Sequence, residues 1–544
     1  MSSLPGEDQA APGLAFGVAP MRSETRTLPA LLTIFGIFLA ATLPVLTSPV
    51  LPLIDFYNHM ARYFVLSTLD GDAFLQQNYA ARWDILPNIG LDVIVVGLMR
   101  LLPGGFGVQG TIVLIFAVQY SGVLFFNRVL TGRWSPLVAL LMVPLLYSFI
   151  FNWGFANFLL GIGLVFWAAG WWLAMRDRLW LALPVALVLA TAIFFVHGVA
   201  FALYGILVAA LELGLFLQRR PRRFLALVRA MLPLIAQAVI PALLFLATKT
   251  SQNPDGVTNA DEAVVRLASK GTLVQRVWEV SHHRLMTIVR VAEGPSLLFD
   301  AVTLAITLAL ILLLMRRGRL VVMPLAWPAL ALAALLVLIV PPAMFGVGAV
   351  ADRMPLFFAM LAIGALCWRP PAGRTDRLAV AGLGALVGVR LVAIAADWTG
   401  YARDKADFDQ VAAALPRHVL VETIAVSPPR DAGLRRCQMF GPLLITDHGA
   451  AGRLFANSDQ QPIRIIGPLD AAIQKADRKR PPDATLDERR LVSLDAAVRG
   501  GFPWLLTCDF TALPQHLPPG AAIIASAGRF TLVRLPTATP VPET

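Results

Sequence analysis

The sequence predicts a mainly α-helical protein, a polytopic transmembrane bundle of about eleven spans with a small α/β domain at its C-terminal end. Three observations predict this fold class. Residues of the set AVILMFWYC make up 57% of the 544 positions, and charged residues make up only 15%. The apolar runs also recur at lengths that cross about 30 Å of hydrocarbon. A water-soluble protein carries about 25% charged residues, so this composition excludes one.

The net charge of the chain is +11. In a soluble protein such a balance would suggest nucleic acid as a partner. In a membrane protein it is typical of arginines in cytoplasmic loops, which orient the helices, so we expect no nucleic-acid partner. Three cysteines in the whole chain also exclude a disulfide scaffold.

The apolar runs define the expected spans, with boundary errors of about four residues. The first run follows Arg22 and Arg26 and has no small-residue cleavage site after it, which predicts an uncleaved signal anchor. The expected spans are 28–48, 107–127, 135–151, 157–175, 179–196, 199–217, 225–247, 297–315, 320–340, 353–369 and 378–396.

Basic residues between the spans set the expected orientation, because loops rich in Lys and Arg stay in the cytoplasm. The clusters at 219–223, 316–319 and 369–377 are therefore expected on the cytoplasmic side of a bacterial inner membrane. The resulting divisions are a cytoplasmic N-terminal tail at 1–27, a transmembrane module at 28–399 with external loops 49–106 and 248–296, and an extracytoplasmic α/β domain at 400–544.

This count closes only if the stretch 86–103 does not cross the membrane. Asp92 and Arg100, with one proline and one glycine nearby, favour an interfacial or re-entrant helix there. If the stretch does cross, every side assigned between it and the tail must be argued again.

The C-terminal tail differs in composition from the membrane module. It is rich in Pro, Asp and Arg and has no run long enough to span. Short β-like runs at 419–422, 504–507, 522–525 and 530–535 predict a small α/β domain. Cys437 and Cys508 both fall in this tail, where a disulfide between them and two separate buried thiols remain equally open.

The densest group of polar residues follows the first span. If Asp55 opens a helix, Asp55, His59 and Arg62 lie on one face at positions i, i+4 and i+7. An acid, an imidazole and a guanidinium in one stripe can take a proton from a hydroxyl and hold an anion. The alternative is an amphipathic helix whose polar face simply contacts water.

A second acidic motif, Asp70-Gly71-Asp72, follows within the same loop. Two carboxylates one residue apart can share a divalent cation. A glycine between two acids is also a common turn, so Asp70 and Asp72 are weak candidates for a metal site.

Two further external turns carry candidate substrate-binding residues. Asn152, Trp153 and Asn157 could bind a sugar by amide hydrogen bonds and ring stacking, or belong to the aromatic belt at the interface. His197 sits at a membrane edge, where such residues are often functional, or else it is a turn histidine bonded to a carbonyl. Arg353 starts a later span and could bind phosphate, or form only a local ion pair with Asp352.

The loop 248–296 is unusually basic for an external segment. Its basic residues suggest a phosphate or pyrophosphate partner at the membrane surface. The pair His282-His283 is weak support for a metal, because adjacent helical positions diverge by about 100°. The basic positions are Lys249, Arg266, Lys270, Arg276, Arg284 and Arg290.

The order of these segments resembles the GT-C superfamily of membrane glycosyltransferases. The motifs that carry the resemblance are the octapeptide Asp55-Phe56-Tyr57-Asn58-His59-Met60-Ala61-Arg62 and the stretch from Leu86-Pro87-Asn88 to Asp92, which look most like uncharacterised bacterial members. The resemblance implies transfer of a sugar from a polyprenyl-phosphate carrier to an envelope glycan or lipid, on the extracytoplasmic face.

The resemblance also implies roles for particular residues. Asp55 would be the general base or would position the acceptor, and no metal would be required, although a divalent ion is possible. Many members have a second acid directly beside this aspartate, whereas here Ile54 and Phe56 flank it. His59 is a possible substitute. The leaving phosphate needs a cation, for which we expect Arg353 first and Lys270 second.

Two other functions suit the same sequence. A transporter or flippase for lipid-linked saccharides would also need many helices and basic loops, but transporters favour charges and broken helices in mid-membrane. The third is a non-catalytic envelope scaffold that binds a partner through its tail. Donor sugar, acceptor, linkage and oligomeric state do not follow from the sequence.

Overall fold

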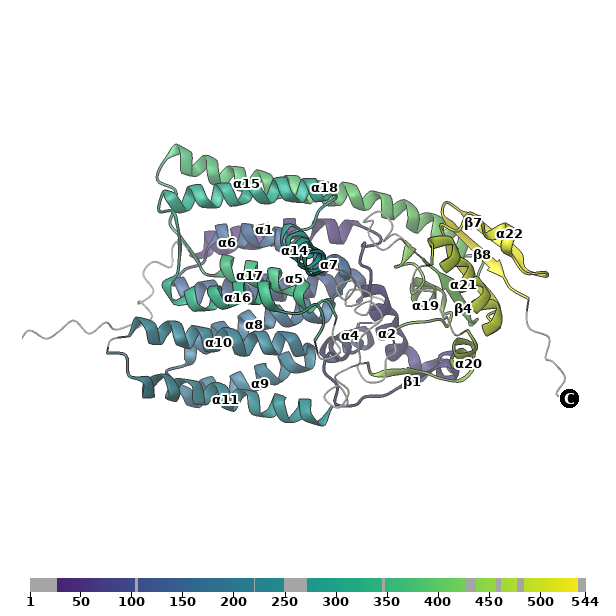
Figure 1. Cartoon of the computed structure of the whole chain (residues 1–544), viewed down its shortest axis with the longest axis horizontal. Helices are drawn as coiled ribbons and strands as arrows, with labels where there is room; N and C mark the ends of the chain where they lie inside the picture. Colours follow the sequence, from purple (N-terminus) through teal and green to yellow (C-terminus); the bar gives the residue numbers. More distant parts are fainter. Residues whose placement is uncertain are drawn as a thin grey trace, which may run out of the picture.

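The structure is a computed structural model of the chain, in which a bundle of roughly parallel and antiparallel helices carries the C-terminal tail at one end (Figure 1). We refer to this end of the bundle as the tail side. The residues described are 27–102, 106–219, 221–248, 272–344, 348–426, 437–455, 461–476 and 484–536.

Nine helices within the described ranges are long and apolar enough to cross a membrane. Their high mean hydropathy follows directly from the apolar runs of the sequence, so the predicted fold class is confirmed. The nine are α1 Thr27–Thr47, α5 Val108–Thr131, the pair α6 Pro136–Leu146 and α7 Phe149–Trp153, α8 Ala156–Met175, α9 Leu179–Val196, α10 Gly198–Gln218, α11 Phe224–Ala247, α15 Leu297–Arg316 and α18 Arg374–Ala412.

The other two expected spans are shorter helices than predicted. The span expected at 320–340 is the 13-residue α16 Trp327–Ile339, and the one expected at 353–369 is the 15-residue α17 Val350–Gly364. The start of the first expected span and the end of the second form short strands instead of helix. These strands, β2 Leu320–Val322 and β3 Leu366–Trp368, pair antiparallel. A turn of 3-10 helix, η3 Pro324–Ala326, leads into α16.

The chain between α1 and α5 folds on the tail side. It contains α2 Phe56–Thr68, the 3-10 turn η2 Leu69–Gly71, α3 Ala73–Asn78, β1 Tyr79–Ala81 and α4 Gly90–Leu101. With 12 residues, α4 is about 18 Å long, too short to cross the hydrocarbon. The expectation that the stretch 86–103 does not cross therefore agrees with the structure.

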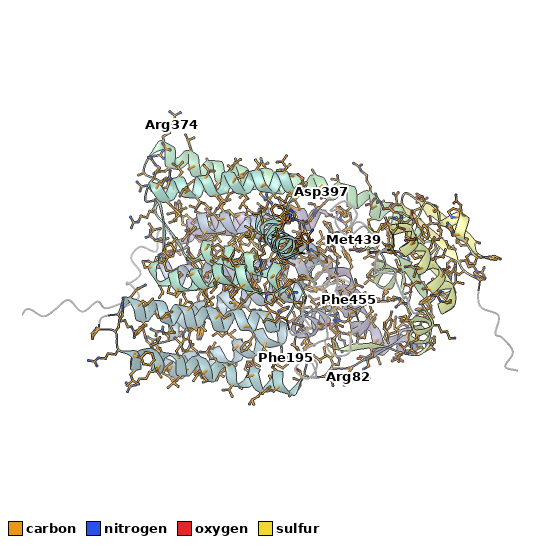
Figure 2. The ribbon with its side chains drawn as sticks, in the orientation of Figure 1. Arg82, Phe195, Arg374, Asp397, Met439 and Phe455 are labelled. Atoms are coloured by element: carbon orange, nitrogen blue, oxygen red, sulfur yellow. A yellow bond between two sulfur atoms is a disulfide. The ribbon has the colours of Figure 1, made fainter. Side chains whose placement is uncertain are left out.

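One helix, α18, connects the bundle to the tail without a break. Its 39 residues run about 58 Å. It therefore crosses the boundary expected between residues 399 and 400, and its last turns bury Tyr401, Phe408 and Val411 in the tail. Figure 2 shows Arg374, at the start of this helix, at the end of the bundle away from the tail, while Met439 and Phe455 lie where the bundle meets the tail.

The tail has a four-stranded sheet in the order β4-β6-β8-β7. Strand β4 Val421–Ile424 is parallel to β6 Trp504–Cys508, and β8 Phe530–Arg534 is antiparallel to both β6 and β7 Ala522–Ala527. All four β-like runs predicted from the sequence form strands. The tail helices are α19 Leu443–His448, α20 Gly467–Lys475, α21 Leu486–Gly500 and α22 Leu513–His516.

A second sheet joins the tail to the chain that follows α1. Strand β5 Ile463–Ile465 pairs antiparallel with β1, with Ala80 opposite Arg464. The hydroxyl of Tyr79 also donates to the carbonyl of Gly452 at 2.6 Å. Residues that are nearly 400 positions apart in the sequence thus form one ladder, and the tail packs on the segment that holds Asp55.

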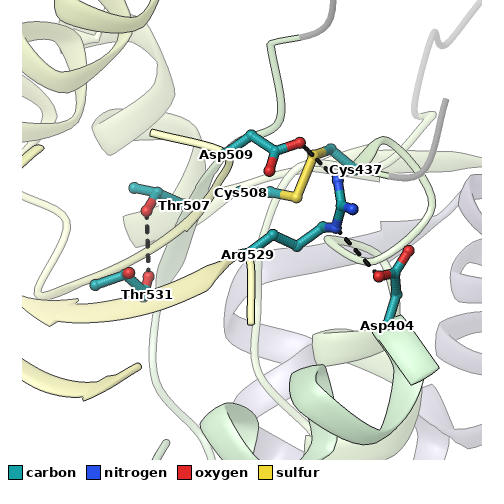
Figure 3. Close-up of a disulfide and its surroundings, with 7 residues drawn as sticks. All are labelled: Asp404, Cys437, Thr507, Cys508, Asp509, Arg529 and Thr531. Carbon is teal, nitrogen blue, oxygen red and sulfur yellow. Dashed lines mark hydrogen bonds and ion pairs between the residues drawn. A yellow bond between two sulfur atoms is a disulfide. The ribbon is translucent and has the colours of Figure 1, made fainter. Parts of the chain in front are cut away.

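A disulfide joins Cys437 to Cys508 (Figure 3). Beside it, Arg529 pairs with Asp509 at 2.8 Å and with Asp404 of α18 at 3.1 Å. Of the two alternatives left open by the sequence, the bonded pair is the one observed. Both the disulfide and this ion-pair bridge fasten the tail, the first internally and the second to α18.

Helix α14 Leu273–Val289 precedes α15 and has a different direction from the spans. Figure 1 shows it nearly end-on, while α10, α15 and α18 are seen from the side. It therefore lies across the bundle.

Candidate active site

Asp55 is the residue that ends the connection from α1 and begins α2. It occupies the N-cap position of α2, as predicted, but its side chain accepts no capping hydrogen bond. Its position is fixed through the backbone instead. The Asp55 N–H donates to the carbonyl of Trp153 at 3.0 Å, and the Ile54 N–H donates to the carbonyl of Asn152 at 3.1 Å. The carboxylate is thus available for another role.

The turn that receives these hydrogen bonds depends on Gly154. This residue has a φ of +80°, and a Cβ added to it would lie 2.5 Å from the nitrogen of Phe56 and 3.1 Å from that of Asp55. Glycine is the residue that tolerates both the left-handed backbone and the close approach. The aromatic turn at 151–158 therefore supports Asp55 by main-chain contact.

The same turn carries the aromatic rings that surround Arg353. The guanidinium lies 4.6 Å from the ring centre of Phe155 and 5.4 Å from that of Phe158. On its other side, Phe158 meets the ring of His197 edge-on at 5.4 Å. Arg353 and His197 are both buried. Three helices, α8, α9 and α17, thus bring these two predicted residues to one place.

Asp55 adjoins this group through the turn at 151–158, which holds its backbone and carries Phe155 and Phe158. Burial raises the pKa of the Asp55 carboxyl to about 7, and the positive charge of Arg353 opposes that shift. Burial, with a contribution from the charge of Arg353, also holds the pKa of the His197 ring well below its usual value. Asp55, His197 and Arg353 therefore form one cluster, with a carboxyl that changes charge near neutral pH.

His59 and Arg62 belong to a second cluster, beside the first. Arg62 is buried and pairs with Asp92 of α4, its Nε lying 2.6 Å from Oδ1 and its Nη2 lying 3.1 Å from Oδ2. The Nη2 of Arg62 also lies 3.0 Å from Nδ1 of His59. The predicted stripe of three residues is therefore divided, because Arg62 pairs with Asp92, whereas the charge that acts on the Asp55 carboxyl is that of Arg353.

The contact with Arg62 determines which ring nitrogen of His59 carries a proton. A guanidinium only donates, so Nδ1 must accept and the proton of the neutral ring lies on Nε2. Burial and the charge of Arg62 hold the pKa of His59 well below its usual value, so the ring is neutral. His59 is thereby a hydrogen-bond donor through Nε2, and it does not suit the role of a substitute base.

His197 has the same arrangement. Its Nδ1 accepts from the N–H of Val199 at 3.2 Å, in the N-cap position of α10. The neutral ring then carries its proton on Nε2 as well. The pKa of about 7 suits Asp55 to general-base chemistry near neutral pH.

The tail covers the second cluster. The ring of Phe455 meets that of His59 edge-on at 5.5 Å, and its carbonyl accepts from Arg62 at 3.5 Å. The tail therefore forms one wall of the space around His59.

The three predicted sugar-binding residues have partners within the protein. The Asn152 side chain donates to Glu293 at 2.7 Å, and the Asn157 side chain donates to the carbonyl of Asn88 at 2.7 Å. Trp153 is half-buried between the rings of Phe149 and Phe155. Asn152 thus ties its turn to the segment before α15, and Asn157 ties α8 to the segment before α4. Among the described residues, Oδ1 of Asn157 and the indole N–H of Trp153 have no hydrogen-bond partner.

Asp70 and Asp72 point to different partners. Asp72 caps α3 by accepting from the N–H groups of Phe74 and Leu75, and the exposed Asp70 pairs with Arg100 at 3.0 Å. In the part of the chain that the structure describes, one group of three possible metal ligands occurs, Cys437, Cys508 and Asp509. Two of these three are joined in the disulfide, so this group does not suit a metal ion.

Part of the basic loop lies outside the described residues, including Lys249, Arg266 and Lys270. Arg276 lies in α14, but its side chain is outside what the structure describes. Arg284 and Arg290 both bind inside the protein. Arg284 donates to the carbonyls of Val337 and Val340 at the end of α16. Arg290 pairs with Glu293. His283 binds Asp352 at 2.7 Å, which accounts for this histidine without a metal.

Two acids of these clusters did not stand out in the sequence. Asp92 was used as a sign that α4 does not cross and as the end of a motif of the resemblance, with no role in a site, and Glu293 was not singled out. Glu293 is buried, and it accepts from Asn152 while its backbone N–H donates to the carbonyl of Tyr147 at 2.7 Å. An isolated acid at the end of an apolar stretch was the available signal for both.

Comparisons with known proteins give a likeness to solved structures and none to a family model or a curated protein. Among solved structures, ArnT from Cupriavidus metallidurans in the apo state is similar, with a TM-score of 0.45 and 11% identity over 93% of this chain and 98% of that chain. The likeness concerns the overall arrangement of the chain and does not extend to particular residues.

Proposed function

We propose that this chain is a membrane glycosyltransferase of the GT-C type. It transfers a sugar from a polyprenyl-phosphate-linked donor to an envelope glycan or lipid, on the tail side of the membrane. The observation that supports this most is the meeting of Asp55, Arg353 and His197, a base, a cation and a hydrogen-bond donor, at the tail-side ends of apolar spans.

Asp55 is proposed as the general base. Displacement at the sugar carbon needs the acceptor hydroxyl to lose its proton, and a carboxylate with a pKa near 7 takes that proton efficiently at neutral pH. The bond between the sugar carbon and the phosphate oxygen breaks as the new glycosidic bond forms. The phosphate leaves with the electron pair of that bond, on the polyprenyl carrier.

Arg353 is proposed to receive the leaving phosphate. It projects from the first turn of α17, and its guanidinium can bind two phosphate oxygens at once. The ring donors, Nε2 of His197 and of His59, would hold sugar or phosphate oxygens. Arg62 would act by keeping His59 in its orientation, since its own guanidinium is engaged by Asp92.

The tail is proposed to contribute to the acceptor site. Phe455 lies against His59, and β5 pairs with β1, so that the tail is built onto the segment that carries the base. No step in this scheme requires a metal ion.

The test replaces Asp55 by Asn and follows incorporation of labelled sugar into envelope glycan and lipid in cells that express only the variant. We expect transfer to fall by about 10²–10⁴-fold, the usual contribution of a general base. Asp84→Asn is the matched control, because it removes an exposed carboxylate from the same segment. Wild-type transfer by Asp55→Asn, at a normal protein level, would refute the assignment of the base.

The transporter alternative is tested with the purified protein in liposomes. A flippase moves a labelled lipid-linked sugar between leaflets without breaking its phosphate bond, whereas a transferase releases polyprenyl phosphate. Movement without release would favour the transporter. Loss of function on deleting residues 400–544, together with full function of Asp55→Asn, would favour a scaffold.

A further inference from the structure

Helix α14 carries a stripe of exposed apolar side chains. Val274 and Trp278 are 78% and 69% exposed, and Leu285 and Ile288 are also exposed. The spacings between them are four, seven and three residues, so at about 100° per residue all four lie within roughly 80° of the helix surface. A helix in contact with water alone would not carry such a stripe.

The opposite side of α14 binds the bundle. Thr287 is buried, His283 binds Asp352 at the start of α17, and Arg284 donates to the carbonyls that end α16. A capping box at Thr272 and Gln275 also begins the helix. The orientation of α14 is therefore fixed by polar contacts on one side, which leaves the apolar stripe directed away from the bundle.

The surroundings of the stripe indicate what it contacts. Arg284 holds α14 at the end of α16, where Leu338 and Ile339 are exposed, and α14 also packs against α15, where Leu298 is exposed. Exposed leucine and isoleucine on membrane-length or apolar helices face lipid. The stripe on α14 therefore continues the lipid-facing surface of the bundle.

The direction of α14 places it at the edge of the membrane. It lies across the spans, near their tail-side ends (Figures 1 and 2). A helix with an apolar face that is parallel to the membrane plane sits at the boundary between headgroups and acyl chains, where tryptophan is also preferred.

We propose that α14 is a membrane-surface helix, whose stripe of Val274, Trp278, Leu285 and Ile288 inserts at the headgroup boundary of the tail-side leaflet. Its partner is the lipid surface. The contact between His283 and Asp352 connects α14 to the first turn of α17, which carries Arg353. The position of α14 in the lipid therefore affects the position of that turn. The inference does not depend on the proposed function.

The test places a fluorescent label on the full-length protein in nanodiscs. The free Cys367 is first replaced by Ser, and Trp278→Cys is labelled with an environment-sensitive dye. Glu279→Cys, the next residue along and also exposed, is the matched control. Leu285→Cys provides a second stripe position if Trp278→Cys does not fold.

We expect lipids with a quencher near the headgroup to quench the label at 278 or 285 several-fold more strongly than aqueous iodide does, and the reverse at 279. Iodide quenching at 278 equal to that at 279 would mean that the stripe faces water. Quenching by neither would mean that a protein surface, such as a second copy, covers the stripe. Strongest quenching by lipids labelled at the chain end would place α14 deep in the bilayer. Each of these three results overturns the proposal.

Discussion

The backbone N–H of Asp55 donates to the carbonyl of Trp153 at 3.0 Å. This contact joins the cap of α2 to the turn between α7 and α8, and the same turn presents Phe155 and Phe158 to Arg353. The proposed base and the proposed phosphate ligand thus share one support. A change in this turn should affect both residues without removing either.

Gly154→Ala tests this support. We expect transfer activity to fall at least ten-fold, because the new Cβ would lie 2.5 Å from the nitrogen of Phe56 and must displace Asp55. Gly132→Ala is a matched control, since Gly132 has a similar φ of +76° but open space around its Cβ position. In both variants the left-handed backbone of the new alanine lowers the free energy of unfolding by about 1–2 kcal/mol.

The comparison of the two variants separates strain from displacement. Melting temperature and labelled-sugar transfer are measured for both proteins. Equal activity of Gly154→Ala and Gly132→Ala would show that the turn at 151–158 does not position Asp55.

The pH dependence of transfer reports on Asp55. Since the base must be ionised, activity should rise with pH and level off above an apparent pKa of about 7. The charge of Arg353 lowers this pKa, so Arg353→Gln should move the rising limb to higher pH in addition to weakening donor binding. Arg82→Gln, which removes another cation from the tail side, is the control. If the pH profile of Arg353→Gln rose at the same pH as that of the wild type, the charge of Arg353 would not affect the pKa of Asp55.

The buried pair of Arg62 and Asp92 should be important for stability. Asp92→Asn leaves the Arg62 guanidinium buried without its counter-charge, and we expect a loss of about 3–5 kcal/mol. Replacing both residues, as Arg62→Met with Asp92→Leu, should cost less than Asp92→Asn alone. Thermal unfolding of the purified variants measures both effects.

A pair on the surface provides the comparison for this prediction. Arg100 and Asp70 form an exposed ion pair, so Arg100→Gln should cost less than about 1 kcal/mol. If Asp92→Asn were no more costly than Arg100→Gln, the pair between α2 and α4 would not hold these helices together.

The disulfide should stabilise the tail. Cys437→Ser with Cys508→Ser removes a link that closes a loop across a sequence separation of 71, and we expect a loss of about 2–4 kcal/mol. The expected readouts are faster proteolysis of the tail and a change of gel mobility on reduction of the native protein. Cys367→Ser should leave both unchanged. A native protein whose mobility and proteolysis do not respond to reductant would lack the bond.

Local features of the sequence were sufficient to predict the helices. An apolar run of about twenty residues forms a helix in a membrane because its backbone groups must bond within the segment. Nine of the expected runs are such helices, and the β-like runs of the tail are strands. The same local reasoning placed Asp55 at the start of a helix.

The boundaries of the short spans could not be predicted in this way. Residues 320–322 and 366–368 are as apolar as their neighbours, but they pair with each other as strands. The length of α18 is a similar case. The expected span ended at residue 396, but the helix continues to Ala412, and its last turns are buried in the tail. Pairing partners decide these limits.

What the sequence determined by itself was the class of protein, the positions of most helices and a set of polar residues on one side of the membrane. The tertiary structure decided how those residues are grouped. It pairs Arg62 with Asp92, and it places Asp55 beside the turn at 151–158, whose aromatic rings contact Arg353 and His197. The physical reason is that helix formation depends on neighbours in the chain, whereas the partners of a charge depend on which helices pack side by side.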